Sequence, residues 1–185
     1  MNYTNTTIKE FIHKIIKYDN IDNILKTCDS EFAIQEKGFI FERLFDIFIK
    51  FGFCDLFNNT DYYHIIGNSN NGKPKILTNF DKYLSKKVIS SNSSGCSDIT
   101  LQNKKDKTYI FISSKYQNNI SVDNFDIQNI VAMIDHNKHI YTKYKIYIIV
   151  SNKNKVLKKV NISCPTSEYI TKYITLENML DINQI

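Results

Sequence analysis

The chain has no tryptophan, two prolines and a single arginine, Arg43, among its 185 residues. No run of apolar residues reaches the roughly 18 that a membrane-spanning helix needs, so we expect none. The N-terminal residues, MNYTNTTIKE, lack the apolar stretch of a signal peptide. The four cysteines are scattered without a CxxC pair, so neither a zinc ribbon nor a disulfide framework is indicated. We therefore expect an intracellular, reducing location.

The residues that are abundant point to the source and to one class of partner. There are 30 isoleucines, 22 asparagines and 23 lysines, a bias typical of an AT-rich genome. Apolar residues make up 42% of the chain, enough for the core of one domain. The net charge of +5 is compatible with a polyanionic partner such as nucleic acid. The near absence of arginine argues against a dense base-reading surface in the major groove.

The hydrophobic periodicity predicts an α/β fold with a small mixed β-sheet flanked by helices. A long polar stretch over 68–95 interrupts the regular elements and contains a short predicted helix near 77–84. The expected helices cover 1–26, 30–51 and 124–136, and a last helix starts near 176. The expected strands cover 61–67, 97–101, 109–115, 144–150, 156–160 and 170–176, with a loop at 102–107.

Three charged residues form the constellation that carries chemistry. If 97–101 and 109–115 form a hairpin, Asp98 and Lys115 meet at its open end. Glu42 lies on a helix that is otherwise full of apolar side chains, where a carboxylate is either snorkelling or functional. Carboxylates that hold Mg²⁺, together with a lysine that orients water or stabilises negative charge, are what metal-dependent phosphodiester cleavage needs.

At these residues the sequence resembles a known family. The segments KGFIFERLF (37–45), GCSDITL (95–101), YIFISSKY (109–116) and FDIQNI (125–130) are similar, in this order, to the PD-(D/E)XK nuclease superfamily. The nearest resemblance is to restriction-endonuclease-like, Mrr-type domains, some of which stand at the N-terminus of helicases in large DNA viruses. The resemblance covers about residues 30–152 and implies an α–β–β–β–α–β core. The motif is short and degenerate, and such motifs also arise by accident.

The resemblance implies a role for each matching residue. Asp98 corresponds to the metal-binding aspartate, Glu42 to the acidic residue of the first core helix and Lys115 to the lysine, while Gln128 matches a helix glutamine more weakly. The implied cofactor is Mg²⁺ or Mn²⁺, and the implied activity is an endonuclease that cleaves DNA. A helicase or ATPase domain in the same chain is an implied partner, and the implied location is the infected host's cytoplasm or the virion.

The resemblance also suggests how the chain is divided. We expect a helical appendage over 1–29, a restriction-endonuclease-like domain over 30–176, and a linker to a further region over 177–185. A double-strand break by a single-site nuclease needs a second monomer, so a homodimer is one expected form.

Ser113 departs from the family pattern, which has a carboxylate or glutamine at that position. A neutral hydroxyl is a poor ligand for Mg²⁺ beside a carboxylate, although it can bond a metal-bound water. Asp46 lies one helical turn after Glu42, so these two carboxylates and Asp98 are an alternative ligand set. The competing hypothesis is a catalytically inactive module of the same fold that binds DNA or docks a partner. A third hypothesis is a generic α/β interaction domain whose match to the motif is accidental.

Several other residues are candidates for contact with nucleic acid. The residues expected to touch a phosphate backbone are Lys86, Lys87, Ser94 and Gly95, and Tyr116 is expected to stack on a base. The lysines at 104, 105 and 107 are interpreted as a solvated face. His136 and His139 are spaced for a metal but lack a third ligand, so a role at a helix C-terminus is favoured.

Overall fold

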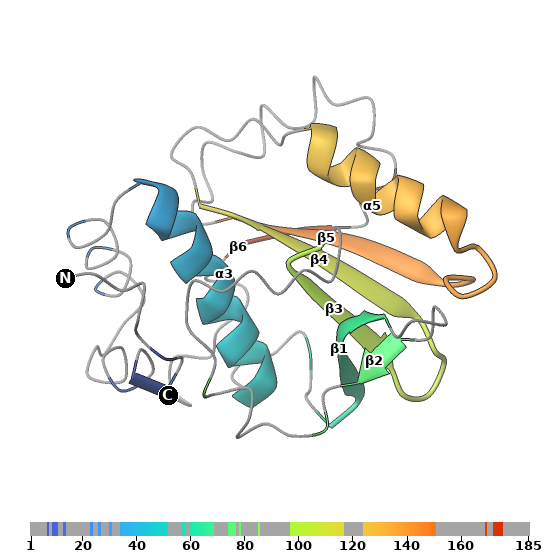
Figure 1. Cartoon of the computed structure of the whole chain (residues 1–185), viewed down its shortest axis with the longest axis horizontal. Coiled ribbons are helices and arrows are strands. Elements are labelled where there is room, and N and C mark those ends of the chain that lie inside the picture. Colours follow the sequence, from blue (N-terminus) through green and yellow to red (C-terminus); the bar gives the residue numbers. More distant parts are fainter. Residues whose placement is uncertain are drawn as a thin grey trace.

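A computed structural model gives the fold of the chain (Figure 1). The residues that the structure describes are 34–51, 57, 60–68, 74–76, 78, 97–116, 124–150, 169 and 172–175, together with the isolated positions 7, 9, 10, 13, 23, 26, 30 and 85.

One mixed sheet organises the described part of the chain, with its six strands in the order β2-β1-β3-β4-β5-β6. The strands are β1 (Tyr62–Asn68), β2 (Pro74–Ile76), β3 (Ile99–Asn103), β4 (Tyr109–Lys115), β5 (Tyr144–Val150) and β6 (Lys172–Thr175). The pairs from β2 to β4 are antiparallel, whereas β4, β5 and β6 run parallel. The strand β4 is therefore the centre of the sheet and joins its two halves.

In the described part of the chain, two helices cover the sheet, α3 (Ile34–Phe51) and α5 (Asn124–His136). The helix α5 connects β4 to its parallel neighbour β5, and α3 packs on β4 (Figure 1). Alternate residues of β4 point to opposite faces, so both faces of this strand are buried. The expected α/β class with a mixed sheet flanked by helices is confirmed.

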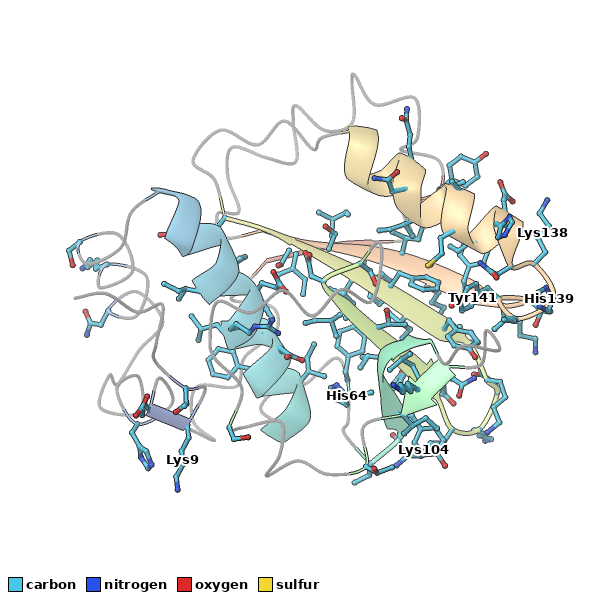
Figure 2. All side chains as sticks on the ribbon, viewed as in Figure 1. Lys9, His64, Lys104, Lys138, His139 and Tyr141 are labelled. Carbon is cyan, nitrogen blue, oxygen red and sulfur yellow. The ribbon has the colours of Figure 1, made fainter. Side chains whose placement is uncertain are left out.

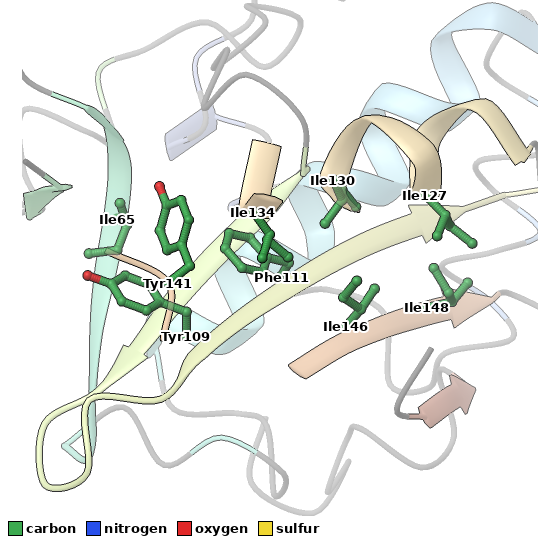
Figure 3. Packing of buried hydrophobic residues seen from close by; sticks show 9 residues of the cluster. All are labelled: Ile65, Tyr109, Phe111, Ile127, Ile130, Ile134, Tyr141, Ile146 and Ile148. Atoms are coloured by element: carbon green, nitrogen blue, oxygen red, sulfur yellow. The ribbon is translucent and has the colours of Figure 1, made fainter. Parts of the chain in front are cut away.

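The core between α5 and the sheet is continuous. Its apolar side chains interdigitate across α5, β4 and β5, and Ile65 extends the cluster onto β1 (Figure 3). The buried residues of this cluster are Ile65, Tyr109, Phe111, Ile127, Ile130, Ile134, Tyr141, Ile146 and Ile148. The predicted apolar stripe of α5 is thus confirmed. The helix ends where Asn137 donates its side-chain amide to the carbonyl of Met133, 2.9 Å away.

Several predicted elements have the expected bounds, and others need correction. The strand over 109–115, the helix over 124–136 and the strand over 144–150 are confirmed exactly. The strand expected at 97–101 instead covers 99–103, because Asp98 lies in a bend before β3. The polar stretch 68–95 contains a short strand, β2, that the sequence does not predict, and Thr78, within the short helix predicted over 77–84, is not helical.

The predicted N-terminal helix is visible only at separate positions. Thr7 and Glu10 form a reciprocal capping box, in which each backbone N–H bonds the other residue's side chain at 2.7 Å and 3.2 Å. Lys9, His13 and Lys26 are helical and exposed. The expected strand over 156–160 and the helix start after 176 lie outside the described residues, and the strand expected at 170–176 covers Lys172–Thr175.

The buried Tyr109 makes the core sensitive to alkaline pH. Its ring meets Tyr141 edge-on at 4.8 Å, and burial raises the pKa of its hydroxyl, with Tyr141 adding to the effect. The folded-state pKa therefore exceeds the unfolded value of about 10, so stability is full below that pH and falls as pH rises through the folded pKa. We expect urea unfolding at pH 9 to 11 to show a steeper loss of stability in the wild type than in Tyr109→Phe. Equal slopes for the two proteins would contradict this prediction.

Candidate functional site

The carboxylate of Asp98 is held at the end of β4. Its Oδ2 accepts the backbone N–H of Ser114 at 2.6 Å and the Ser114 hydroxyl at 3.1 Å. The Ser113 hydroxyl is a longer and weaker donor at 3.4 Å. The backbone N–H of Asp98 donates to the carbonyl of Ile112 at 3.0 Å, which continues the β3–β4 ladder by one bond. The carboxylate thus accepts the N–H of Ser114 on β4, where a backbone carbonyl of the neighbouring strand would otherwise accept it.

The surroundings of this carboxylate are largely buried. Register in the hairpin pairs Ile99 with Ile112, which sets position 98 across from Ser113, a residue that is only 3% exposed. Ser97 is also buried, and its hydroxyl shares a 2.7 Å hydrogen bond with that of Thr100. Asp98 itself is half-buried. All three described donors meet Oδ2, so Oδ1 accepts no hydrogen bond from the described part of the chain.

The helix α3 reaches the same end of the sheet. The ring of Phe41 lies 5.2 Å from the ring of Tyr116, the first residue after β4. Glu42 follows Phe41 on this helix and is half-buried. The contact gives Tyr116, also half-buried, a packing partner, and its expected stacking on a base stays a prediction.

Asp46 has a structural partner on its own helix. Its Oδ2 lies 3.4 Å from Nη1 of Arg43, and the two residues are 5% and 3% exposed. A buried carboxylate that pairs with a buried guanidinium can become a metal ligand only by giving up that pairing. The structure therefore argues against the ligand set in which Asp46 joins Glu42 and Asp98.

The other expected catalytic residues fall at different places. Lys115 ends β4, two positions after Ser113, and its backbone pairs with Val150, so it belongs to the same end of the sheet as Asp98. Gln128 is exposed on α5, whereas its neighbour Ile127 points into the core. Gln128 is therefore on the outer side of its helix.

The remaining predicted contacts with nucleic acid cannot be located. Lys86, Lys87, Ser94 and Gly95 lie outside the described residues. His136 is in the last turn of α5 and exposed, as the favoured helix-terminal role requires, and His139 is exposed in the turn that follows.

Sequence reasoning missed Ser114, the strongest partner of Asp98. Its signal was present, since two serines precede the lysine, but only Ser113 occupies the position that the family pattern singles out. Which serine bonds the carboxylate depends on the local geometry where β3 begins. The pairing of Arg43 with Asp46 also had a signal, because two opposite charges stand three positions apart in an apolar helix.

The oxygen ligands available at this end of the sheet fit a magnesium ion only if the ion keeps most of its bound water. Mg²⁺ binds through oxygen, retains several waters and often uses one or two carboxylates plus substrate phosphates. Among the described residues, no group of three acidic, histidine or cysteine side chains is arranged to hold a metal. Oδ1 of Asp98, which accepts no hydrogen bond from the described residues, satisfies the smaller requirement of one direct ligand.

Comparisons with protein-family models, curated proteins and solved structures found no match to this chain. Within the described residues, no helix is both long enough and apolar enough to cross a membrane.

Proposed function

We propose that this chain is a metal-dependent DNA endonuclease domain of the PD-(D/E)XK type. The observation that carries the proposal is the fixed carboxylate of Asp98, whose Oδ1 accepts no hydrogen bond from the described residues, at the end of the sheet where β4 finishes with Lys115. The element order supports it, since α3, β1, β3, β4, α5 and β5 follow the helix–strand–strand–strand–helix–strand order implied by the resemblance, with β2 as an addition.

In this proposal each residue of the chain has a separate task. Asp98 would hold Mg²⁺ or Mn²⁺ through Oδ1, while the N–H and hydroxyl of Ser114 keep the carboxylate oriented through Oδ2. Glu42 would bond water around the ion, and Ser113 would contribute a hydroxyl in place of the usual carboxylate. When bound, the ion polarises a phosphoryl oxygen and lowers the pKa of water. Lys115 would orient the attacking water and offset the negative charge that develops on the phosphate.

A second function is favoured by a specific observation. The only oxygen of Asp98 with described donors is Oδ2, and its bonds to β4 are those of a structural cap rather than a catalytic ligand. Together with Ser113, this supports a nuclease-fold module that has lost cleavage and binds DNA or docks a partner, such as a helicase domain. The two functions differ in whether Oδ1 of Asp98 binds a divalent cation.

Calorimetric titration of the full chain with Mn²⁺ and with Mg²⁺ separates these functions. Under the nuclease proposal we expect binding in the wild type that disappears in Asp98→Ala. The matched control is Asp135→Ala, which removes an exposed carboxylate that pairs with Lys138 at the C-terminal end of α5. This variant should leave the titration unchanged. Equal titration curves for the wild type and Asp98→Ala would count against a metal site at Asp98 and favour the inactive module.

A further inference from the structure

A second charged surface lies at the other end of the sheet. It consists of five exposed lysines, which we call the basic turn patch: Lys104, Lys105, Lys107, Lys143 and Lys145. The first three belong to the turn between β3 and β4, and the last two lie at the start of β5. The two segments are joined where the N–H of Tyr109 donates to the carbonyl of Lys143 at 2.9 Å.

The turn that carries three of these lysines is held in one conformation. The side chain of Asn103 accepts the N–H groups of Lys105 and Asp106 at 2.8 Å and 3.2 Å. Lys107 has a φ of 62°, in the left-handed region that lysine seldom adopts. The ammonium groups of Lys104 and Lys107 lie 5.1 Å and 5.8 Å from the centre of the Tyr63 ring, within range of a cation–π contact. The charges are therefore presented by an ordered scaffold.

Few negative charges balance this patch. The described carboxylates of this turn and the adjoining start of β1 are those of Asp61 and Asp106, so five positive charges meet two negative ones. The Asp106 carboxylate accepts the N–H of Thr108 at 2.9 Å, and this bond is the main cause of its lowered pKa, to which Lys143 and Lys145 add through space. An excess of three positive charges remains for an outside partner.

An exposed aromatic ring lies at the start of β5, on the other face of the strand from Lys145. Tyr144 is 38% exposed, and successive side chains of a strand point to opposite faces, so this ring is not counted as part of the basic turn patch. Figure 2 shows the turn that carries Lys104 and the end of α5 with Lys138 and His139 on the side of the molecule away from Lys9.

We infer that the basic turn patch binds the sugar–phosphate backbone of DNA, at a place separate from Asp98. The seven residues of β4 span roughly 20 Å at 3.3 Å per residue, and this strand runs from the patch to the Asp98 end. At 3.4 Å per step, that length matches about six base pairs of a duplex lying along the strand. Binding of DNA by the basic turn patch does not depend on cleavage, so it is expected of an inactive module as well.

The experiment measures how the full chain binds a fluorescently labelled duplex of about 20 base pairs, roughly 70 Å long. The fluorescence anisotropy of the duplex reports the binding. A chelator in the buffer removes divalent cations, so the result is independent of any metal site at Asp98. The test variant is Lys143→Gln/Lys145→Gln, whose side chains are exposed. The control variant is Lys9→Gln/Lys26→Gln, which removes the same charge from exposed helical positions near the N-terminus. Melting temperatures verify that both variants are folded.

We expect the test variant to bind about five- to tenfold more weakly than the wild type at low salt. The slope of log K against log salt concentration should fall in magnitude by roughly two, because each lost phosphate contact removes about 0.9. The control variant should change affinity by less than about twofold, because Lys9 and Lys26 are not part of the basic turn patch. Equal losses in both variants would mean that only net charge matters, and an absence of binding by the wild type would also overturn the inference.

Discussion

Asp98→Asn is expected to reduce DNA cleavage by at least about a thousandfold, because stabilisation of transition-state charge by a bound metal is worth several kcal/mol and each 1.4 kcal/mol is tenfold in rate. Asparagine keeps an oxygen that can accept the N–H and hydroxyl of Ser114. It loses the negative charge that would hold a cation. The substitution therefore separates the proposed catalytic role of Asp98 from its structural role as the cap of β4.

The measurement is conversion of supercoiled plasmid to nicked and linear forms with Mg²⁺ or Mn²⁺, alongside thermal unfolding of each protein. Ser114→Ala is the matched control, because it removes one hydroxyl donor but keeps the carboxylate and the backbone N–H. We expect this control to lose about 10- to 100-fold, as is usual when a group that orients a ligand is removed. If Asp98→Asn cut as fast as the wild type, the activity would not depend on this site.

Breaking the pair of Arg43 and Asp46 is expected to cost about 3–5 kcal/mol of folding free energy, the second large effect. Both residues are almost fully buried on α3, with Nη1 and Oδ2 separated by 3.4 Å. Either single change, Arg43→Met or Asp46→Leu, removes one charge of this buried pair and leaves the other charge buried. The double change removes both charges and should recover most of the lost stability, because it replaces the pair by apolar side chains of similar volume.

Urea unfolding of the two single variants, the double variant and the wild type tests this prediction. Lys138 and Asp135 supply the control, since they form an ion pair with the same i, i+3 spacing at 3.3 Å but are 74% and 61% exposed. Lys138→Gln should cost no more than about 1 kcal/mol, because water screens an exposed pair. A double variant less stable than both single variants would show that the pair contributes net stability to α3.

Local sequence pattern was sufficient for the centre of this fold. The segments YIFISSK and YKIYIIV are short β-branched and aromatic runs, and NFDIQNIVAMIDH carries an apolar stripe at helical spacing. These signals depend only on neighbouring residues, and the structure has all three elements with the predicted bounds. The same reasoning placed Asp98 and Lys115 at one end of a hairpin, because antiparallel pairing follows once two strands and their turn are known.

Other features depend on segments that are distant in sequence. Pro74–Ile76 lacks the alternation of apolar and polar residues that is typical of a strand. It becomes β2 because β1 offers an edge with which it can pair. Ser114 rather than Ser113 is the main partner of Asp98 because β3 begins one residue after the carboxylate.

The charge pattern shows the same division between sequence and tertiary structure. The sequence by itself determined that lysines greatly outnumber arginines and that they occur in short clusters. Only the tertiary structure brought Lys143 and Lys145 beside the turn at 104–107, because β5 pairs in parallel with β4 and starts level with Tyr109. Parallel pairing joins residues separated by a whole helix, so the resulting concentration of charge is set by the sheet and not by the local sequence.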